Sequence, residues 1–325
     1  MKKVLAIIIA TVMCAALSIS IFAHEGDTSK NAKNKATITE AYDYPITQAS
    51  SEWKAFQTHA EMIEACQIPK SILSRLSTEA LLESVLDYPL LGDMLAFDNV
   101  SSGYRSGFNS FNGLQELSKR EDMYSVLKAY DAKGTARGIL NGALSKRCAD
   151  VVISELLGSV QAEPRSLVTT RIAEVTNNNV ITPNGTQVPH YEHLTYSDLG
   201  LYEQSEIDGY EDYLDETYPS AVKIAYRKPS YNCHSYAWHS TATSNYCWIN
   251  NPSYYWLDSS YSVTQVPSAG DKLIFINSNY VDHSAIIYDP LNNTVKSKWG
   301  AWGTYRHSRT YSPYSDMSTL FTAYE

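Results

Sequence analysis

The apolar residues of this 325-residue chain repeat with one period in its first half and with another near its C-terminal end. From about 48 to 160 they recur every three or four residues, the spacing of one face of an α-helix. Past Cys233 the chain changes to short segments rich in β-branched and aromatic residues, separated by turns. This change predicts an α+β chain, in which an all-α helical bundle at 47–160 precedes a domain at 223–325 where a helix packs on an antiparallel β-sheet.

Capping residues and prolines predict where the helices of the first region begin and end. Ser50 or Ser51 caps a helix that ends before Pro69, and Ser77 caps a second. A break rich in serine and glycine is expected at 101–107. Further helices are expected over 90–97, as a pair within 111–131, and over 143–157.

The helical region contains no pattern that indicates chemistry. It resembles the helical N-terminal regions of uncharacterised secreted proteins of Gram-positive bacteria, and that resemblance implies no activity. We expect it to act as a spacer, as a mask, or as a module that binds another surface component. Residues 161–222 have little helical signal and are expected to be a linker into the second domain.

The N-terminus has the features of a secretory signal peptide. Lys2 and Lys3 precede an apolar run over 4–21, and Ala23 offers a small residue for cleavage. We therefore expect a signal peptide at 1–23, a flexible polar stalk at 24–46, and a product that is secreted or held at the cell wall. Lipid attachment at Cys14 is an alternative that the bulky Met before it disfavours. No later segment reaches the ~20 apolar residues that span a bilayer.

The charge of the chain excludes one class of partner. The formal net charge of −9 becomes −11 when Lys2 and Lys3 are removed, and no basic stripe or nucleic-acid-binding motif is present. Nucleic acid is therefore not an expected partner.

Four cysteines follow the expected cleavage site. Cys66 and Cys148 lie in helical apolar patterns where burial accounts for them, although a disulfide between them is compatible with export. A zinc site is another alternative, and its ligands would be Cys233, His234, His239 and Cys247. Their spacing matches no familiar zinc motif, so we expect no metal and no cofactor.

The segment 229–240, Pro-Ser-Tyr-Asn-Cys-His-Ser-Tyr-Ala-Trp-His-Ser, places a cysteine just after a turn marked by proline. Cys233, Tyr236, Ala237 and Ser240 have helical spacing, which predicts a helix that begins at Cys233. Unpaired N–H groups and the positive end of the helix dipole stabilise a thiolate at such a position. Because the thiolate is the nucleophilic form of cysteine, Cys233 is the candidate nucleophile.

Three strands are expected after this helix, over 272–276, 281–288 and 294–299. A cysteine nucleophile needs a base that takes its proton and returns it to the leaving amine. His283, near the start of the second strand, is the candidate base. His234 and His239 are weaker candidates, because they lie on the helix of Cys233 but do not share its face.

Three short motifs support this pair by resemblance. Asn232-Cys233-His234-Ser235-Tyr236-Ala237-Trp238 is similar to the cysteine motif of the CHAP family, Ala269-Gly270-Asp271-Lys272-Leu273-Ile274-Phe275 resembles the Gly-Asp strand of the NlpC and CHAP families, and Asp282-His283-Ser284-Ala285-Ile286-Ile287 resembles their histidine strand. The resemblance covers about 229–310. It implies a papain-like fold and a catalytic pair formed by Cys233 and His283.

These families place a third polar residue on the following strand, where it orients the histidine. Ser297 is the positional match in this chain, and His307 is an alternative that would fold back from beyond it. Because serine orients a histidine only weakly, the third catalytic position departs from the family pattern.

The surroundings of the catalytic pair are less well defined by the sequence. The backbone N–H of Cys233 is a candidate oxyanion donor, with Tyr231 or Asn232 as a side-chain donor. Trp238 and Trp299 belong either to the core or to a groove for a sugar or a peptide.

The sequence thus predicts a secreted bacterial cysteine hydrolase that cleaves amide bonds. The family resemblance implies peptidoglycan stem peptides or the muramoyl-alanine linkage as substrate, so the expected partner is peptidoglycan or a peptide. A transamidase or deamidase that forms the same acyl-enzyme is the close alternative. A non-catalytic cell-surface binding protein that keeps the fold is the alternative from another class.

Overall fold

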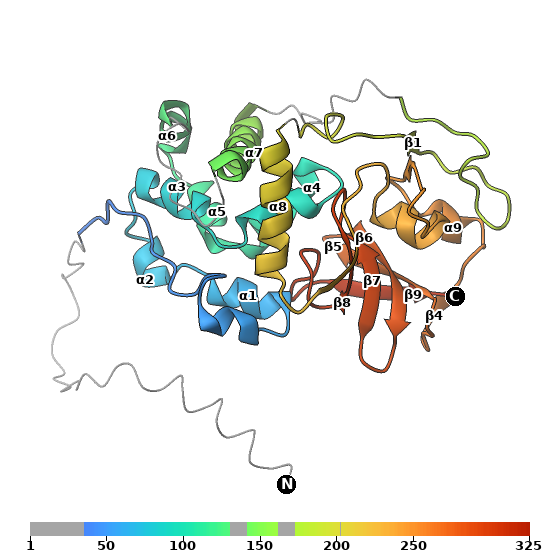
Figure 1. Cartoon of the computed structure of the whole chain (residues 1–325). Helices are drawn as coiled ribbons and strands as arrows, with labels where there is room; N and C mark the ends of the chain where they lie inside the picture. The colour runs from blue at the N-terminus through green and yellow to red at the C-terminus, as the bar shows by residue number, and fades with distance from the viewer. Residues whose placement is uncertain (1–35, 131–141, 162–172, 202) are drawn as a thin grey trace, which may run out of the picture. The chain divides into compact units, whose positions relative to one another are not determined.

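The computed structural model describes residues 36–130, 142–161, 173–201 and 203–325, and Thr37–Glu325 form one compact unit with an α+β fold (Figure 1). The expected signal peptide at 1–23, with Cys14, lies outside the described residues, as do positions 24–35 of the expected stalk and 162–172 of the expected linker. Among the described residues, no helix combines the length and the apolar character needed to cross a bilayer.

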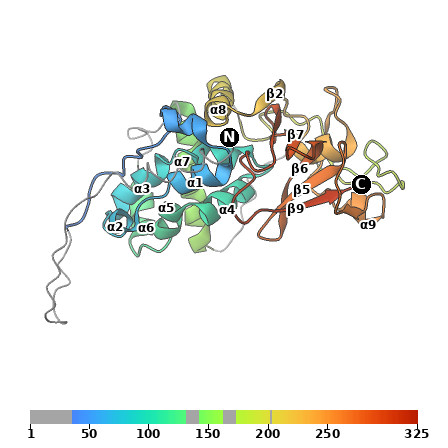
Figure 2. The same cartoon turned by 90° about the horizontal axis from the view of Figure 1, so that it is seen from below.

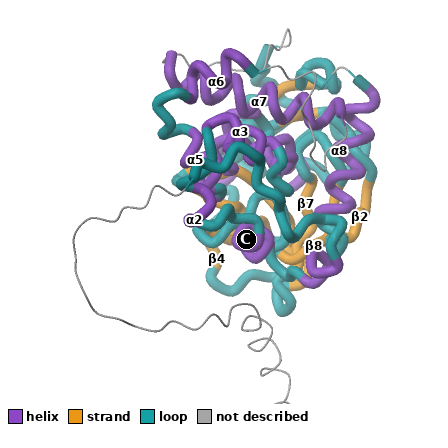
Figure 3. The backbone as a smooth tube through the Cα atoms, turned by 90° about the vertical axis from the view of Figure 1, so that its left-hand side faces the viewer, coloured by secondary structure: helices purple, strands orange, loops and turns teal. Residues whose placement is uncertain are grey.

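Helices dominate the described chain up to residue 217. Two are 3-10 helices, η1 Ser51–Ala55 and η2 Leu91–Ala96. The α-helices are α1 His59–Ala65, α2 Lys70–Leu73, α3 Thr78–Leu86, α4 Val100–Ser110, α5 Asn112–Leu117, α6 Met123–Ala129, α7 Gly142–Gln161 and α8 Gln204–Thr217. Figure 3 views the molecule from the side of these helices and colours them purple.

An antiparallel sheet dominates the remainder. Its strands are β2 Val222–Ala225, β4 Val263–Thr264, β5 Lys272–Asn277, β6 Tyr280–Asp289, β7 Thr294–Lys298, β8 Thr304–Ser308 and β9 Leu320–Tyr324. They pair in the order β2-β8-β7-β6-β5-β9-β4. Figure 2 labels β2, β7, β6, β5 and β9 of this sheet. A separate ladder joins β1 Tyr191–Glu192 to β3 Cys247–Trp248. The π-helix η3 Ser235–His239 and the short helix α9 Tyr254–Leu257 lie between these strands in the chain.

Several predicted elements form at the predicted places. Ser77 caps α3 by accepting a hydrogen bond from the backbone N–H of Ala80. The strands expected over 272–276, 281–288 and 294–299 appear as β5, β6 and β7, with bounds that differ by one residue at most. The short segments expected over 90–97 and within 111–131 are also helical.

Three predictions about the helical region are wrong. The single helix expected between Ser50 and Pro69 is divided, because Thr58 and Glu61 form a capping box that starts α1 separately from η1. The expected break at 101–107 lies inside α4. The expected flexible stalk is packed over its described part, where Tyr44 is 7% exposed and donates to the backbone oxygen of Ser84.

The helices and one face of the sheet share a hydrophobic core. The larger core contains helical residues such as Leu81, Leu114 and Val152 together with sheet residues such as Leu273 and Val295. The division predicted between 47–160 and 223–325 therefore separates helices from strands but does not separate two cores. Hydrogen bonds cross it, for example from the indole of Trp302 to the backbone oxygen of Leu95 (2.9 Å).

The sheet has two faces that meet different cores. Leu273, Phe275, Ala285, Ile287 and Val295 belong to the larger core, and we call their side of the sheet the larger-core face. A smaller core lies on the other side and contains Ile274 with Ala237 and Trp238 of the cysteine helix. Since side chains alternate along a strand, neighbouring residues of β5 and β6 meet different cores.

A buried carboxylate joins three helices and a loop. Asp93, next to the middle of η2, accepts hydrogen bonds from the hydroxyls of Tyr218 (2.7 Å) and Tyr213 (3.0 Å), and pairs with His59 Nε2 (2.9 Å). The other ring nitrogen of His59 lies 2.6 Å from the backbone oxygen of Ser315. This network fixes η2 against α1 and α8, and so fixes the segment that follows η2.

Helix α4 approaches η2 so closely that one of its positions requires glycine. A Cβ atom at Gly103 would lie 2.0 Å from the backbone oxygen of Met94, whereas a Cβ at Gly107 would lie 3.6 Å from the Met94 side chain. The contact at Gly103 is with a backbone atom, which cannot move away by changing a side-chain rotamer. The contact at Gly107 is an ordinary van der Waals contact.

We therefore predict opposite effects of alanine at these two glycines of one helix. Gly103→Ala should lower the free energy of unfolding by about 1–3 kcal/mol, since α4 must move away from η2. Gly107→Ala, the matched control, should raise it by about 0.5–1 kcal/mol, because alanine favours the helix. Urea unfolding followed by circular dichroism measures both. Equal stability of the two variants would contradict the close approach.

Candidate active site

The predicted helix does begin at Cys233, and Asn232 is its cap. The Asn232 side-chain oxygen accepts from the backbone N–H groups of Ser235 (3.0 Å) and Ile249 (3.2 Å). After one α-helical turn the backbone widens into the π-helix η3, where the N–H of Ser240 donates to the oxygen of Ser235. Such widened turns are frequent at functional sites.

Cys233 is joined to the helical region through Asp98, which follows η2. The Cys233 sulfur lies 3.8 Å from Asp98 Oδ2, in the geometry of a thiol that donates to a carboxylate. Asn232 Nδ2 donates to the same Asp98 oxygen (2.7 Å), and His234 Nε2 lies 3.6 Å from it. No sequence signal indicates Asp98 as a site residue, because it lies 135 residues before Cys233 with no motif around it.

Burial controls the charges of this cluster. It raises the pKa of the Cys233 thiol well above its ordinary value, and the Asp98 carboxylate raises it further, while the backbone N–H groups of His234 and Ser284 donate to the sulfur and oppose the rise. Burial also raises the pKa of Asp98 to about 7 and lowers that of His234 to about 3. The thiolate expected at the helix start is therefore not favoured in this arrangement, since burial outweighs the helix terminus.

A buried lysine lies near the cluster. Lys298 at the end of β7 is completely buried and donates to the backbone oxygens of Gly300 (2.7 Å) and Trp302 (2.8 Å). Burial lowers its pKa to about 7, although the charges of Cys233 and Asp98 act in the opposite direction. Its ammonium also lies 4.8 Å from the ring centre of Tyr231.

His283 lies in β6 on the larger-core face. Its ring is completely buried, stacks on Tyr314 with 3.7 Å between ring centres, and meets Phe275 edge to face. Within the described chain, neither ring nitrogen has a hydrogen-bond partner. Burial, with smaller effects of His307 and His234, places the pKa of His283 well below its ordinary value, so the ring is neutral.

The structure brings Cys233 beside β6, but it gives no hydrogen bond between Cys233 and His283 among the described residues. Ser284, the next residue along β6, contacts the cysteine helix instead. Its backbone N–H donates to the Cys233 sulfur, and its hydroxyl hydrogen-bonds Trp238 Nε1 (2.9 Å) and His234 Nδ1 (2.8 Å). Alternation along β6 turns the His283 ring towards the other core.

Ser297 and His307 are hydrogen-bonded to each other, not to His283. His307 Nδ1 lies 2.8 Å from the backbone oxygen of Ser308, which requires a proton on Nδ1. His307 Nε2 is then an acceptor for the Ser297 hydroxyl (2.7 Å) and for Trp299 Nε1 (3.3 Å). Burial lowers the pKa of His307 to about 4.

The side chains predicted to contact substrate are buried in this structure. Tyr231, Asn232, Trp238 and Trp299 are 2%, 0%, 4% and 0% exposed. Both amide hydrogens of Asn232 are used, by Asp98 and by the backbone oxygen of Ile249 (2.7 Å). Trp238 packs among aromatic rings that include Tyr255 and Trp256. The groove interpretation of these tryptophans is therefore not supported, and the core interpretation accounts for them.

The four cysteines in the described chain, Cys66, Cys148, Cys233 and Cys247, are free thiols. The described residues that could hold a metal ion together are Asp98, Cys233 and His234, whose ligand atoms all lie within 4.8 Å of one another. This group differs from the set considered above, because His239 and Cys247 are absent from it and Asp98 is present. A thiol that donates to Asp98 accounts for the same contacts.

A cavity of about 60 Å³ lies against Asp98. Its walls come from η2 and its following segment, from Arg147 of α7, and from Trp248 and Trp302. Asp98 therefore lies between this cavity and the thiol, which is 1% exposed.

Comparison with protein-family models, with curated proteins and with solved structures finds no match for this chain.

We predict that Cys233 is alkylated slowly by iodoacetamide at neutral pH, because burial and Asp98 raise the pKa of its thiol. Asp98→Asn should accelerate the reaction, since removal of the negative charge lowers that pKa. Asp150→Asn, on the exposed part of α7, is the control and should leave the rate unchanged. Peptide mass spectrometry measures alkylation at each cysteine separately. An unchanged rate in Asp98→Asn would exclude control of the thiol by this carboxylate.

We also predict that stability falls as pH is lowered from about 6.5 to about 4. His234, His283 and His307 have depressed pKa values when folded, so the unfolded chain binds more protons, at up to about 1.4 kcal/mol per pH unit for each histidine. Asp98 has the opposite effect on stability, because its pKa is raised in the folded state and the folded chain therefore binds the extra proton. Its contribution offsets that of one histidine. His307→Gln should flatten the dependence, whereas replacement of the exposed His193 by Gln should not. Urea unfolding at a series of pH values tests this, and a wild-type stability that rises towards pH 4 would contradict it.

Proposed function

We propose that this protein is a cysteine hydrolase of amide bonds, with Cys233 as nucleophile and His283 as general base. One observation carries the proposal. His283 is a buried imidazole for which no described residue serves as a hydrogen-bond partner, and it is adjacent in β6 to Ser284, whose N–H binds the Cys233 sulfur. An unsatisfied buried group of this kind costs about 1–3 kcal/mol, so its retention calls for a functional explanation.

Catalysis requires a change from the arrangement described above. The Cys233 proton now points towards Asp98, and the His283 ring is stacked on Tyr314. A ring nitrogen of His283 would have to approach the sulfur, which requires a shift of the cysteine helix or of β6 as well as rotation of the imidazole. Catalytic hydrogen bonds are often absent before substrate binds, so the present separation is compatible with this role.

In the reaction, His283 takes the thiol proton and the Cys233 thiolate attacks the amide carbonyl carbon. The carbon–sulfur bond forms, the carbon–nitrogen bond breaks, and the imidazolium returns the proton to the leaving amine. Water then attacks the thioester with His283 again as base, which releases a carboxylic acid and restores the thiol. The backbone N–H groups of His234 and Ser284 at the sulfur favour the thiolate once Asp98 withdraws.

The sequence supports the substrate class. The three motifs around Cys233, Gly270-Asp271 and His283 resemble those of the NlpC and CHAP families, which implies a papain-like domain and peptidoglycan peptides as substrate. The apolar segment at 4–21 supports export to the compartment where peptidoglycan lies. A transamidase or deamidase would use the same thioester and replace water by an amine or act on a side-chain amide.

A second candidate function has its own supporting observation. Cys233 and His283 are 1% and 0% exposed, and the pKa of the thiol is raised. A cell-surface binding protein that keeps the fold without turnover would have a permanently closed site of this kind.

The test is digestion of isolated peptidoglycan by the purified mature protein, with released fragments identified by mass spectrometry. Wild type should release fragments that name the bond cleaved. Cys233→Ala and His283→Ala should lose about 10²- to 10⁴-fold in rate, because they lack the nucleophile and the base. His239→Ala, an exposed histidine at the end of the same helix, is the matched control and should remain active.

The variant Asp98→Asn tests whether His283 or Asp98, the carboxylate beside the thiol, is the general base. If His283 is the base, this variant keeps or gains activity, because Asp98 holds the thiol in its resting arrangement. If Asp98 takes the proton, the variant is inactive and His283→Ala is not. The binding protein would be favoured by two results together. Wild type would fail to cleave peptidoglycan or peptide amides, and Cys233→Ala would bind the same material as well as wild type does.

A further inference from the structure

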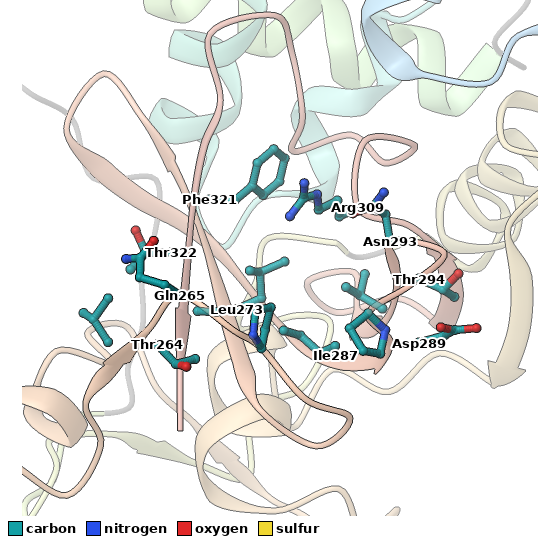
Figure 4. Close-up of a pocket in the computed structure, with 15 residues that line it drawn as sticks. Thr264, Gln265, Leu273, Ile287, Asp289, Asn293, Thr294, Arg309, Phe321 and Thr322 are labelled. Carbon is teal, nitrogen blue, oxygen red and sulfur yellow. The ribbon is translucent and has the colours of Figure 1, made fainter.

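A second cavity, of about 350 Å³, opens on the sheet away from the cysteine helix (Figure 4). Its floor is formed by Leu273, Ile287, Val295 and Ala323, which come from four adjacent strands of the larger-core face. These side chains are apolar, and three of them are at most 6% exposed. The cavity does not include Cys233, Asp98 or His283 in its lining, so its role is independent of the hydrolase proposed above.

One wall of the cavity carries a positive charge that has no ion-pair partner among the described residues. The guanidinium carbon of Arg309 lies 5.0 Å from the ring centre of Phe321, and Figure 4 shows the two side chains together at one end. In the described part of the chain, the Arg309 side chain makes no ion pair or hydrogen bond. The backbone N–H of Arg309 donates to the oxygen of Asn293 (2.9 Å), which fixes the residue beside the cavity.

The negative charge in the cavity is already engaged. Asp289 lies at the end of β6, where one carboxylate oxygen accepts from the Asn292 side chain (2.7 Å) and the other from the backbone N–H of Leu291 (3.1 Å). The remaining polar lining, from Thr264, Gln265 and Thr294 among others, is uncharged. The cavity therefore combines an apolar floor with a guanidinium that pairs with no carboxylate of the described chain.

We propose that this cavity binds an aliphatic carboxylate. The carboxylate would pair with Arg309, whose planar guanidinium suits two parallel hydrogen bonds, and the hydrocarbon part would lie on Leu273, Ile287 and Val295. The volume is within the range of pockets for small ligands. Two sources share this chemistry, a free fatty acid and the C-terminal residue of a peptide with an aliphatic side chain.

Calorimetric titration of the mature protein tests the proposal with both sources. The probes are butanoate, hexanoate and octanoate for the free acid, and N-acetyl-Ala-Leu for the peptide end. Affinity should rise about fourfold for each methylene until the floor is covered. Tighter binding of one series than of the other identifies the source. Octylamine and the amide of the dipeptide, which lack the carboxylate, should not bind.

Variants of two arginines supply the control. Arg309→Gln should weaken binding by at least about tenfold, and Arg309→Lys should weaken it less, because charge is kept and the paired geometry is lost. Arg306 of β8 also stacks on an aromatic ring, that of Tyr288 (5.3 Å), but is not part of the cavity, so Arg306→Gln should bind as wild type. Thermal unfolding by circular dichroism confirms that each variant is folded. Absence of binding at millimolar probe, or equal binding by folded Arg309→Gln, would overturn the proposal.

Discussion

The carboxylate of Asp93 is the interaction on which the arrangement of this molecule depends. It is 7% exposed and takes hydrogen bonds from two tyrosines of the α8 region and from His59 of α1. A buried charge is tolerated only when its partners are well placed, so these four side chains hold one another in position. The carboxylate thereby sets η2 against helices that are far from it in sequence.

The position of η2 determines which residues of the helical region contact the sheet and the cysteine helix. The backbone oxygen of Ala96 at its end accepts from the hydroxyl of Tyr314 (2.6 Å), the residue on which His283 stacks. Gly300 has a φ of 51°, and a Cβ there would lie 2.4 Å from the same oxygen, so only glycine suits this position. Asp98, two residues after Ala96, contacts the Cys233 sulfur. The candidate site is therefore assembled from both halves of the chain.

Part of the fold and of the candidate site could be predicted from local sequence signals. The Ser77 cap, the strand over 272–276 and the helix that begins at Cys233 follow from residues within one or two turns of each element. Helix α4 could not be predicted from its sequence, because glycine normally disfavours helices. The close contact of Gly103 with Met94, which explains this glycine, is visible only in the structure. Asp98 could not be found at all, since its role rests on a contact across 135 residues. The orientation of His283 depends on the register of β6, and a shift of one residue would exchange it with Ser284.

The order of strands in the sheet has a consequence for the time course of folding. β9 is the strand closest to the C-terminal end of the described chain, yet it pairs with both β5 and β4, and so lies inside the sheet. During synthesis, which proceeds from the N-terminus, one edge of β5 stays open until residues 320–324 have left the ribosome. β4 has no partner in the sheet before then. The sheet beside the cysteine helix is thus completed late, and a nascent chain presents an unpaired β5 edge in the meantime.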